Sequence, residues 1–311
     1  MKARKSILAV LLNVLLLTAI VCAGCAPAAT PTPAPTAAPT ATTAPTAAPT
    51  KPAFDIKAVV GKYLAALPDG FGGIAPTALR DQMAAAKIFL LDVREAKELT
   101  DNGFLEGAVN LPIRTLTQNL DKLPAKDQAI VVYCAIGHRG AIAMMTLQLL
   151  GYTNVKSISG GFNAWKAANL AVATGTPVAP TSGQKPDVDK DLFAALDKYV
   201  TALPDGFGGI APAALNDQLA AAKPFLLDVR EAKELTDNGY IAGQVNVPIR
   251  TVYTDLAKLP QDKSAAIVTY CAVGHRGAIA MMALQLAGYT NVKSLSGGFN
   301  AWKAANLTVT K

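Results

Sequence analysis

A long internal repeat is the feature of this 311-residue chain that most constrains its fold. Residues 89–103 read FLLDVREAKELTDNG, and residues 225–239 read the same. The segment SGGFNAWKAANL at 159–170 returns at 296–307, so the offset grows from 136 to 137 residues along the copies. Solenoid repeats have periods of roughly 20–50 residues. The much longer period here therefore predicts two copies of one globular domain and not a solenoid.

Each copy alternates short apolar runs with stretches of helical spacing. In the first copy we expect strands at 88–93, 108–111, 129–133 and 155–158, and helices at 56–67, 76–86, 95–100, 114–120, 140–150 and 162–168. Strands that alternate with helices predict an α/β fold with a parallel sheet flanked by helices on both faces. In such sheets, ligands bind beyond the carboxyl ends of the strands. We place the two domains at 54–172 and 190–311, with a linker at 173–189 that is rich in Pro, Gly, Ser and Thr.

The N-terminus has the pattern of a targeting segment. Three of the first five residues are Lys or Arg, residues 6–21 are almost wholly apolar, and Cys22-Ala23-Gly24-Cys25 follows. This pattern resembles the signal of bacterial lipoproteins, with Cys25 as the lipidated residue after cleavage. We therefore expect residues 1–25 to be a signal segment and the protein to lie outside the cytoplasm, anchored to the bacterial membrane. A plain secretory signal and an uncleaved anchor are the alternatives.

A low-complexity segment separates the signal from the first domain. Residues 26–53 consist mostly of Ala, Pro and Thr, which offer little apolar surface to bury and favour extended polyproline II. At about 3.1 Å per residue, such a segment could reach on the order of 80 Å. We expect a disordered stalk that lifts the domains off a membrane. The formal charge of +7 is scattered, with no basic run interleaved with aromatic residues, so nucleic-acid binding is not expected.

One reactive-looking loop occurs once in each copy. Residues 132–140 read VYCAIGHRG and residues 269–277 read TYCAVGHRG. These loops hold the only two histidines of the chain and its only two cysteines beyond residue 25. Both cysteines follow an expected strand and precede an expected helix, whose dipole and free N–H groups favour an anion. We therefore expect Cys134 and Cys271 to be nucleophiles that react as thiolates.

The rest of each loop would hold an anionic substrate. Glycine relaxes the backbone at position 137, Arg139 adds a positive charge, and His138 could add another. The predicted substrate-binding residues are Ala135, Ile136, Gly137, His138 and Arg139 in the first copy, and Ala272, Val273, Gly274, His275 and Arg276 in the second.

Other interpretations of the cysteines and histidines remain open. The cysteines could simply pack in the core or form a disulfide with each other, and each histidine could be an exposed loop residue. A Cys–His dyad for hydrolysis lacks an orienting Asn or Asp after the histidine. One Cys and one His per domain fall short of the four ligands of a zinc site, so we expect no metal and no cofactor.

The motifs together resemble those of rhodanese-type sulfurtransferase domains. The resemblance lies in LLDVRE at 90–95, GAVNLP at 107–112, YCAIGHR at 133–139 and GGFNAW at 160–165, and in their copies. It covers about three quarters of the chain and implies that each cysteine takes up sulfane sulfur as a persulfide. The donor would be a small sulfur anion such as thiosulfate or polysulfide, and the acceptor a thiol, cyanide or a protein cysteine. Cys-dependent phosphatases are similar, but they place one more residue between Cys and Arg.

The resemblance leaves two questions about this chain. Classical two-domain members usually keep the cysteine in one domain only, whereas this chain keeps it in both, so both sites could be active. A non-catalytic sulfur carrier or sensor tethered by the stalk is the alternative to an enzyme, and a phosphatase is a third reading. Asp92, Arg94, Asp228 and Arg230 are expected to form local ion pairs, with the arginines at the pocket as the alternative.

Overall fold

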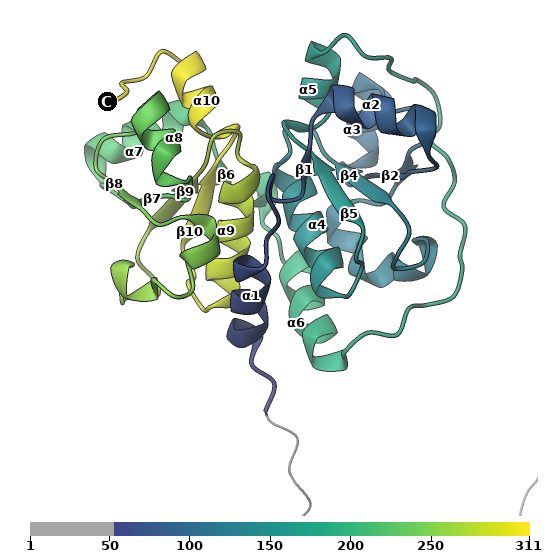
Figure 1. Cartoon of the computed structure of the whole chain (residues 1–311), viewed down its shortest axis with the longest axis horizontal. Helices are drawn as coiled ribbons and strands as arrows, with labels where there is room; N and C mark the ends of the chain where they lie inside the picture. The colour runs from purple at the N-terminus through teal and green to yellow at the C-terminus, as the bar shows by residue number, and fades with distance from the viewer. Residues whose placement is uncertain (1–52) are drawn as a thin grey trace, which may run out of the picture. The chain divides into compact units, whose positions relative to one another are not determined.

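Parallel strands form two sheets of five strands each within residues 53–311, which are the residues that this computed structural model describes (Figure 1). The first repeat supplies β1 (Gly73–Ile74), β2 (Phe89–Asp92), β3 (Val109–Asn110), β4 (Ile130–Tyr133) and β5 (Val155–Ile158). The second supplies β6 (Gly209–Ile210), β7 (Phe225–Asp228), β8 (Gln244–Asn246), β9 (Ile267–Tyr270) and β10 (Val292–Leu295). The strand orders are β1-β5-β4-β2-β3 and β6-β10-β9-β7-β8, so β4 and β9 lie at the centres.

The helices follow the same plan in both repeats. The first repeat contains α1 (Ile56–Ala65), α2 (Pro76–Ala85), α3 (Ala96–Asn102), α4 (His138–Leu149) and α5 (Gly161–Ala167). The second contains α6 (Lys190–Thr201), α7 (Pro212–Ala221), α8 (Ala232–Asn238), α9 (His275–Leu286) and α10 (Gly298–Ala304). Short 3-10 helices are η1 (Ile113–Thr115), η2 (Thr117–Lys122), η3 (Asp205–Gly208), η4 (Ile249–Thr251) and η5 (Leu256–Lys258).

The central strand of each sheet is buried on both faces, as expected for a sheet covered by two helical layers. Val131 and Tyr133 of β4 enter one core with Phe162 of α5, whereas Val132 enters another core with Ile142 of α4. The alternation follows from the two-residue period of a strand. The predicted fold class, with parallel sheets flanked by helices on both faces, is confirmed.

Two kinds of local structure differ from the expectations. The edge strands β1 and β6 were not predicted, because each lies in the glycine-rich segment GFGGI, which has no apolar run. The helix expected at 114–120 is instead the pair of 3-10 helices η1 and η2. Within η2, the backbone is not helical at Asn119. The helix expected at 140–150 begins two residues earlier, at His138, which places the histidine in its first turn.

The first helix of each repeat packs against the other repeat. In the described chain, α1 lies against α9 of the second repeat (Figure 1). It also contacts η4 of that repeat, while α6 contacts η1 and η2 of the first. The hydroxyl of Thr117 in η2 donates a hydrogen bond of 2.7 Å to Asp197 in α6. The two repeats therefore exchange equivalent helices.

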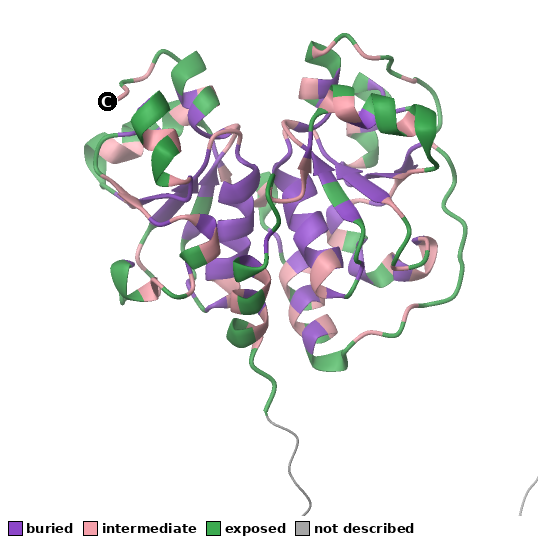
Figure 2. Cartoon of the chain, in the orientation of Figure 1, coloured by how far each residue is buried: buried purple, intermediate pink, exposed green. Residues whose placement is uncertain are grey.

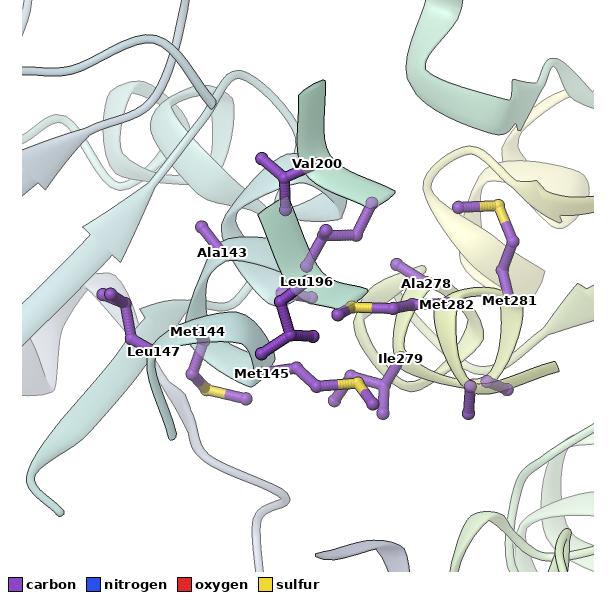
Figure 3. Packing of buried hydrophobic residues seen from close by; sticks show 14 of the residues in the cluster. Ala143, Met144, Met145, Leu147, Leu196, Val200, Ala278, Ile279, Met281 and Met282 are labelled. Carbon is purple, nitrogen blue, oxygen red and sulfur yellow. The ribbon is translucent and has the colours of Figure 1, made fainter. Parts of the chain in front are cut away.

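The helices that follow the cysteine loops, α4 and α9, pack against each other between the two sheets. Figure 2 shows both helices almost entirely buried. Figure 3 shows Met145 of α4 and Met282 of α9 near Leu196 of α6, and all three side chains are fully buried. One hydrophobic core thus contains residues of both repeats, and residues 53–311 belong to a single compact unit.

The expected linker runs along the surface of the first repeat. The N–H of Val178 donates to the carbonyl oxygen of Ala108, and that of Gly183 donates to the carbonyl oxygen of Asp121. The signal segment, the lipidated Cys25 and the stalk at 26–53 were predicted for residues that, apart from Ala53, lie outside the described part of the chain. Among the described residues, no helix is both long and apolar enough to cross a membrane.

Candidate active site

Cys134 lies at the carboxyl end of the central strand, where the chain turns into α4. The turn ends at Gly137, which precedes the helix with φ of 87° in the left-handed region that favours glycine. A Cβ at this position would also lie 3.1 Å from the main-chain nitrogen of Gly160. Residues 134–137 are therefore a tight loop that brings the cysteine to the N-terminus of α4.

The carbonyl groups of this loop are held by the start of α5. The N–H of Phe162 donates to the oxygen of Cys134 at 2.7 Å, and the N–H of Asn163 donates to the oxygen of Ala135 at 2.9 Å. Gly161 allows this approach, since a Cβ there would overlap the oxygen of Cys134. In a trans peptide the N–H points away from the C=O. The following N–H groups of the loop are therefore turned away from α5.

These N–H groups lie where the sequence predicted that the loop would hold an anion. No backbone N–H of residues 135–139 has a hydrogen-bond acceptor in the described part of the chain. They precede or open α4, so the positive end of its dipole adds to their field. The second copy repeats this geometry: Phe299 donates to Cys271 at 2.7 Å and Asn300 to Ala272 at 2.9 Å.

A small cavity opens beside Cys134. Its volume is about 160 Å³, and its lining combines residues of the two repeats: Cys134, Ala135, Ile136, His138 and Arg139 from the first, and Gly206, Phe207, Gly209 and Ser296 from the second. The thiols of Cys134 and Cys271 are free, and both residues are fully buried. The cavity has room for a small anion, and a wall of it comes from the other repeat.

Arg139 lies at the cysteine, but its charge is paired. Both of its Nη atoms donate to the carboxylate of Glu98 at 2.6 Å, and the guanidinium is buried. Burial alone would lower the pKa of Arg139, but the hydrogen bonds to Glu98 and the electrostatic interactions with Cys134 and Glu98 raise it. Burial would likewise raise the pKa of Glu98, and Arg139 lowers it instead. Arg139 therefore remains a cation beside Cys134, in an ion pair with Glu98.

His138 is buried rather than exposed. Its Nε2 donates to the carbonyl oxygen of Phe207 at 2.9 Å, and its Nδ1 has no partner within residues 53–311. Burial, with a smaller effect from Arg139, lowers the pKa of His138 from 6.5 to about 4. The histidine is thus neutral at pH 7 and does not add the positive charge considered from the sequence. His275 is its counterpart, bonded to the oxygen of Phe71 at 2.9 Å.

Asp92 and Arg94 form a buried ion pair beneath the loop. The guanidinium of Arg94 contacts the carboxylate of Asp92 at 2.6 Å and lies 4.2 Å from the ring centre of Phe162. Neither residue lines the cavity at Cys134. Because Phe162 is also the residue that binds the oxygen of Cys134, this ion pair supports the loop from below. Asp228 and Arg230 form the same pair in the second repeat.

Sequence reasoning missed two residues that the structure brings to each loop. Glu98 and Glu234 pair with the loop arginines, and their signal was present in the identical segments 89–103 and 225–239. Phe207 and Phe71 also lie in a repeated segment, LPDGFGGIAP at 67–76 and 203–212, but the repeat does not reveal that each phenylalanine contacts the loop of the other repeat. Among the described residues, no group of three or more His, Cys, Asp or Glu is placed to hold a metal ion.

Comparisons with known proteins identify the same two regions. The model of the Rhodanese-like domain matches residues 75–168 and 211–305. SseB of Mycobacterium tuberculosis is 28% identical over 192 residues, which cover 57% of this chain and 65% of SseB. The thiosulfate:glutathione sulfurtransferase of Homo sapiens is 31% identical over 100 residues, covering 28% of this chain and 86% of that protein.

A longer alignment includes both repeats. A protein of Mycolicibacterium smegmatis whose name refers to thiosulfate sulfurtransferase is 25% identical over 264 residues, covering 71% of this chain and 90% of its own length. This chain spans slightly under two thirds of the length of SseB. The two family matches together cover more than half of the chain, and each contains one cysteine loop. The chain therefore belongs to the rhodanese-like domain family, with two copies of the domain in tandem.

Proposed function

We propose that this protein is a sulfurtransferase that carries sulfane sulfur as a persulfide on Cys134 and on Cys271. The observation that carries the proposal is the set of unpaired loop N–H groups around a buried cysteine at the start of a helix. These groups favour a thiolate and can hold the anionic part of a sulfur donor. The family membership and the names of the relatives support the same chemistry.

The first half-reaction loads the cysteine. With thiosulfate as donor, the Cys134 thiolate attacks the outer sulfur and the S–S bond of thiosulfate breaks. The electron pair of that bond leaves with sulfite, and the protein retains a persulfide anion. The loop N–H groups bind the negative charge before and after transfer, so no proton needs to move. Neutral His138 and the Arg139–Glu98 pair keep this region from carrying a large excess of positive charge.

The second half-reaction releases the sulfur. A thiophilic acceptor such as cyanide, a thiol or a protein cysteine attacks the outer sulfur of the persulfide, and Cys134 leaves as the thiolate. With cyanide the product is thiocyanate. Because the donor product leaves before the acceptor reacts, the kinetics should be ping-pong.

We further propose that the protein works outside the cytoplasm, anchored to the bacterial membrane by a lipid on Cys25. The support is the basic, apolar and small-residue pattern of residues 1–25 and the Pro-rich segment that follows it. The expected result is that the wild type fractionates with membranes and incorporates labelled fatty acid, whereas Cys25→Ala does neither. Unlabelled wild-type protein in the soluble fraction would contradict the anchor.

Intact mass spectrometry tests the chemistry. After incubation with thiosulfate, each single variant, Cys134→Ala or Cys271→Ala, should gain one sulfur atom, and the double variant none. Thiocyanate release then separates the enzyme from a carrier. Repeated turnover supports the sulfurtransferase, whereas a persulfide that no small acceptor discharges supports the tethered carrier. A sulfur adduct that persists in the double variant would contradict both the enzyme and the carrier, because neither loop cysteine would then be needed for it.

A further inference from the structure

A phenylalanine of each repeat lies between two arginines of the other. The ring of Phe207 has the guanidinium carbon of Arg114 4.6 Å from its centre and that of Arg139 4.7 Å away. The ring of Phe71, in the first repeat, has the same relation to Arg250 and Arg276 of the second repeat, at 4.6 and 4.7 Å. Cations over aromatic faces attract, and more strongly where water is excluded.

Polar contacts hold the same loop from the opposite repeat. The Nε of Arg114 donates to the oxygen of Leu203 and one Nη donates to the oxygen of Pro204, both at 2.9 Å. Beyond these, the oxygen of Phe207 accepts the hydrogen bond from His138. We call residues 204–208 and their equivalents 68–72 the cap loops. Each cap loop is bound at its start by one arginine and at its phenylalanine by the active-site histidine and arginine.

The backbone of the cap loops is strained at the phenylalanine. Phe207 and Phe71 both have φ of 54°, in the left-handed region that side chains with a Cβ rarely adopt. Such conformations persist when surrounding contacts hold them, and they concentrate at functional sites. Within each cap loop the N–H of the phenylalanine donates to the oxygen of the proline three residues before it, and the other holding contacts come from the opposite repeat. The conformation of each cap loop therefore depends on the opposite active site.

We propose that the cap loops are crossed: Phe207 controls access and substrate size at Cys134, and Phe71 controls them at Cys271. Phe207 lines the cavity with Cys134, which is fully buried. The cavity of about 160 Å³ holds the volume of roughly five waters, enough for a small sulfur anion. A larger acceptor such as glutathione reaches the sulfur only if the ring of Phe207 moves aside. The statement about substrates rests on the proposed function, whereas the statement about access does not.

Alkylation of proteins that keep one of the two loop cysteines tests the crossing. The backgrounds are Cys271→Ala, which retains Cys134, and Cys134→Ala, which retains Cys271; iodoacetamide labelling is followed by the mass of the peptide that contains the loop cysteine. Phe207→Ala removes both cation–π contacts of this ring, so it should raise the labelling rate of Cys134 about tenfold and leave that of Cys271 within about twofold. Phe71→Ala should do the reverse. The unaffected cysteine reports that each variant is folded.

A second readout addresses the substrate. With Cys134 as the only loop cysteine, Phe207→Ala should raise kcat/KM for glutathione relative to cyanide, while Phe207→Leu, which keeps most of the side-chain volume, should change this ratio less. Equal acceleration at both cysteines, or acceleration only in the repeat that carries the substitution, would overturn the crossed caps. If the alkylation effects are crossed but no persulfide forms, the role of the cap loops is supported and the sulfurtransferase function is contradicted. If a persulfide forms but the alkylation effects are not crossed, the function is supported and the role of the cap loops is contradicted.

Discussion

The Nε2 atom of His138 donates a hydrogen bond of 2.9 Å to the carbonyl oxygen of Phe207, 69 residues further along the chain. The bond joins the first turn of α4 to a loop of the other repeat. It assigns the proton of the neutral ring to Nε2, because a carbonyl oxygen can only accept. The equivalent bond from His275 to Phe71 completes the pair. Docking of the two repeats and the protonation state of both histidines are therefore linked.

This link predicts that the protein loses stability on mild acidification. The pKa of each histidine is lowered from 6.5 to about 4, first of all by burial. Below pH 6.5 the unfolded chain therefore binds protons that the folded protein does not bind until about pH 4. The free energy of unfolding should be constant above pH 6.5 and fall toward pH 4, with a limiting slope of about 2.7 kcal/mol per pH unit for two histidines. Urea unfolding at several pH values between 7.5 and 4.5 measures this dependence of the unfolding free energy on pH.

The double variant His138→Asn, His275→Asn is the control for this slope. Glu98 and Glu234 also have a lowered pKa, so their contribution is lost only as the pH falls below their ordinary value of 4.5. The interval from pH 6.5 to 5 therefore isolates the histidines. An equal slope in the double variant over this interval would show that other groups cause it.

The glycine behind the cysteine loop predicts a local loss of function. A Cβ at Gly161 would overlap the oxygen of Cys134, so Gly161→Ala should displace the loop and abolish persulfide formation at Cys134 while Cys271 still reacts. The mass of each cysteine-containing peptide after thiosulfate treatment measures this. Gly107→Ala is the matched control, since its φ of 79° is also left-handed but its Cβ would meet nothing within 4 Å. Equal effects of the two substitutions would assign the loss to backbone strain alone.

Removal of the partner of Arg139 should change the reactivity of the cysteine. Glu98→Gln leaves the buried guanidinium without its carboxylate, so we expect a loss of about 1–3 kcal/mol in unfolding free energy. The unbalanced positive charge should also favour the thiolate of Cys134 and raise its alkylation rate at pH 6–7. Glu234→Gln should have the same effect at Cys271, and each variant serves as the control for the other. Slower alkylation at the substituted site would show that the ion pair acts through geometry instead.

The buried pair below the loop should be one of the largest single contributions to stability. Arg94→Met leaves the fully buried carboxylate of Asp92 without its cation, at a cost of about 3–5 kcal/mol. Arg80→Met removes an exposed arginine from Asp81 and should cost less than about 1 kcal/mol. The two unfolding free energies in urea compare the pairs directly. Similar losses in both variants would mean that Asp92 finds another partner or takes up a proton.

Local patterns predicted the repeats, the parallel sheets and the cysteine loops. The apolar run 129–133 became β4 because every side chain in it can be buried, and Gly137 became the turn because the backbone there needs a left-handed φ. The loop N–H groups follow from the same short segment. Each of these features depends on residues that are close together in the sequence. The sequence pattern is therefore sufficient to predict them.

The tertiary structure decided against which repeat each segment packs. The two copies have nearly the same sequence, so α1 and the loop around Phe71 find the same chemistry on either copy, and no pattern distinguishes packing within a repeat from packing across the pair. Only the joint packing of α4, α9 and the exchanged helices places Phe207 on Arg139 and buries His138. The sequence by itself thus determined two cysteine loops, and the tertiary structure determined that each is closed by the other repeat, because contacts between distant segments are selected by burial and not by local pattern.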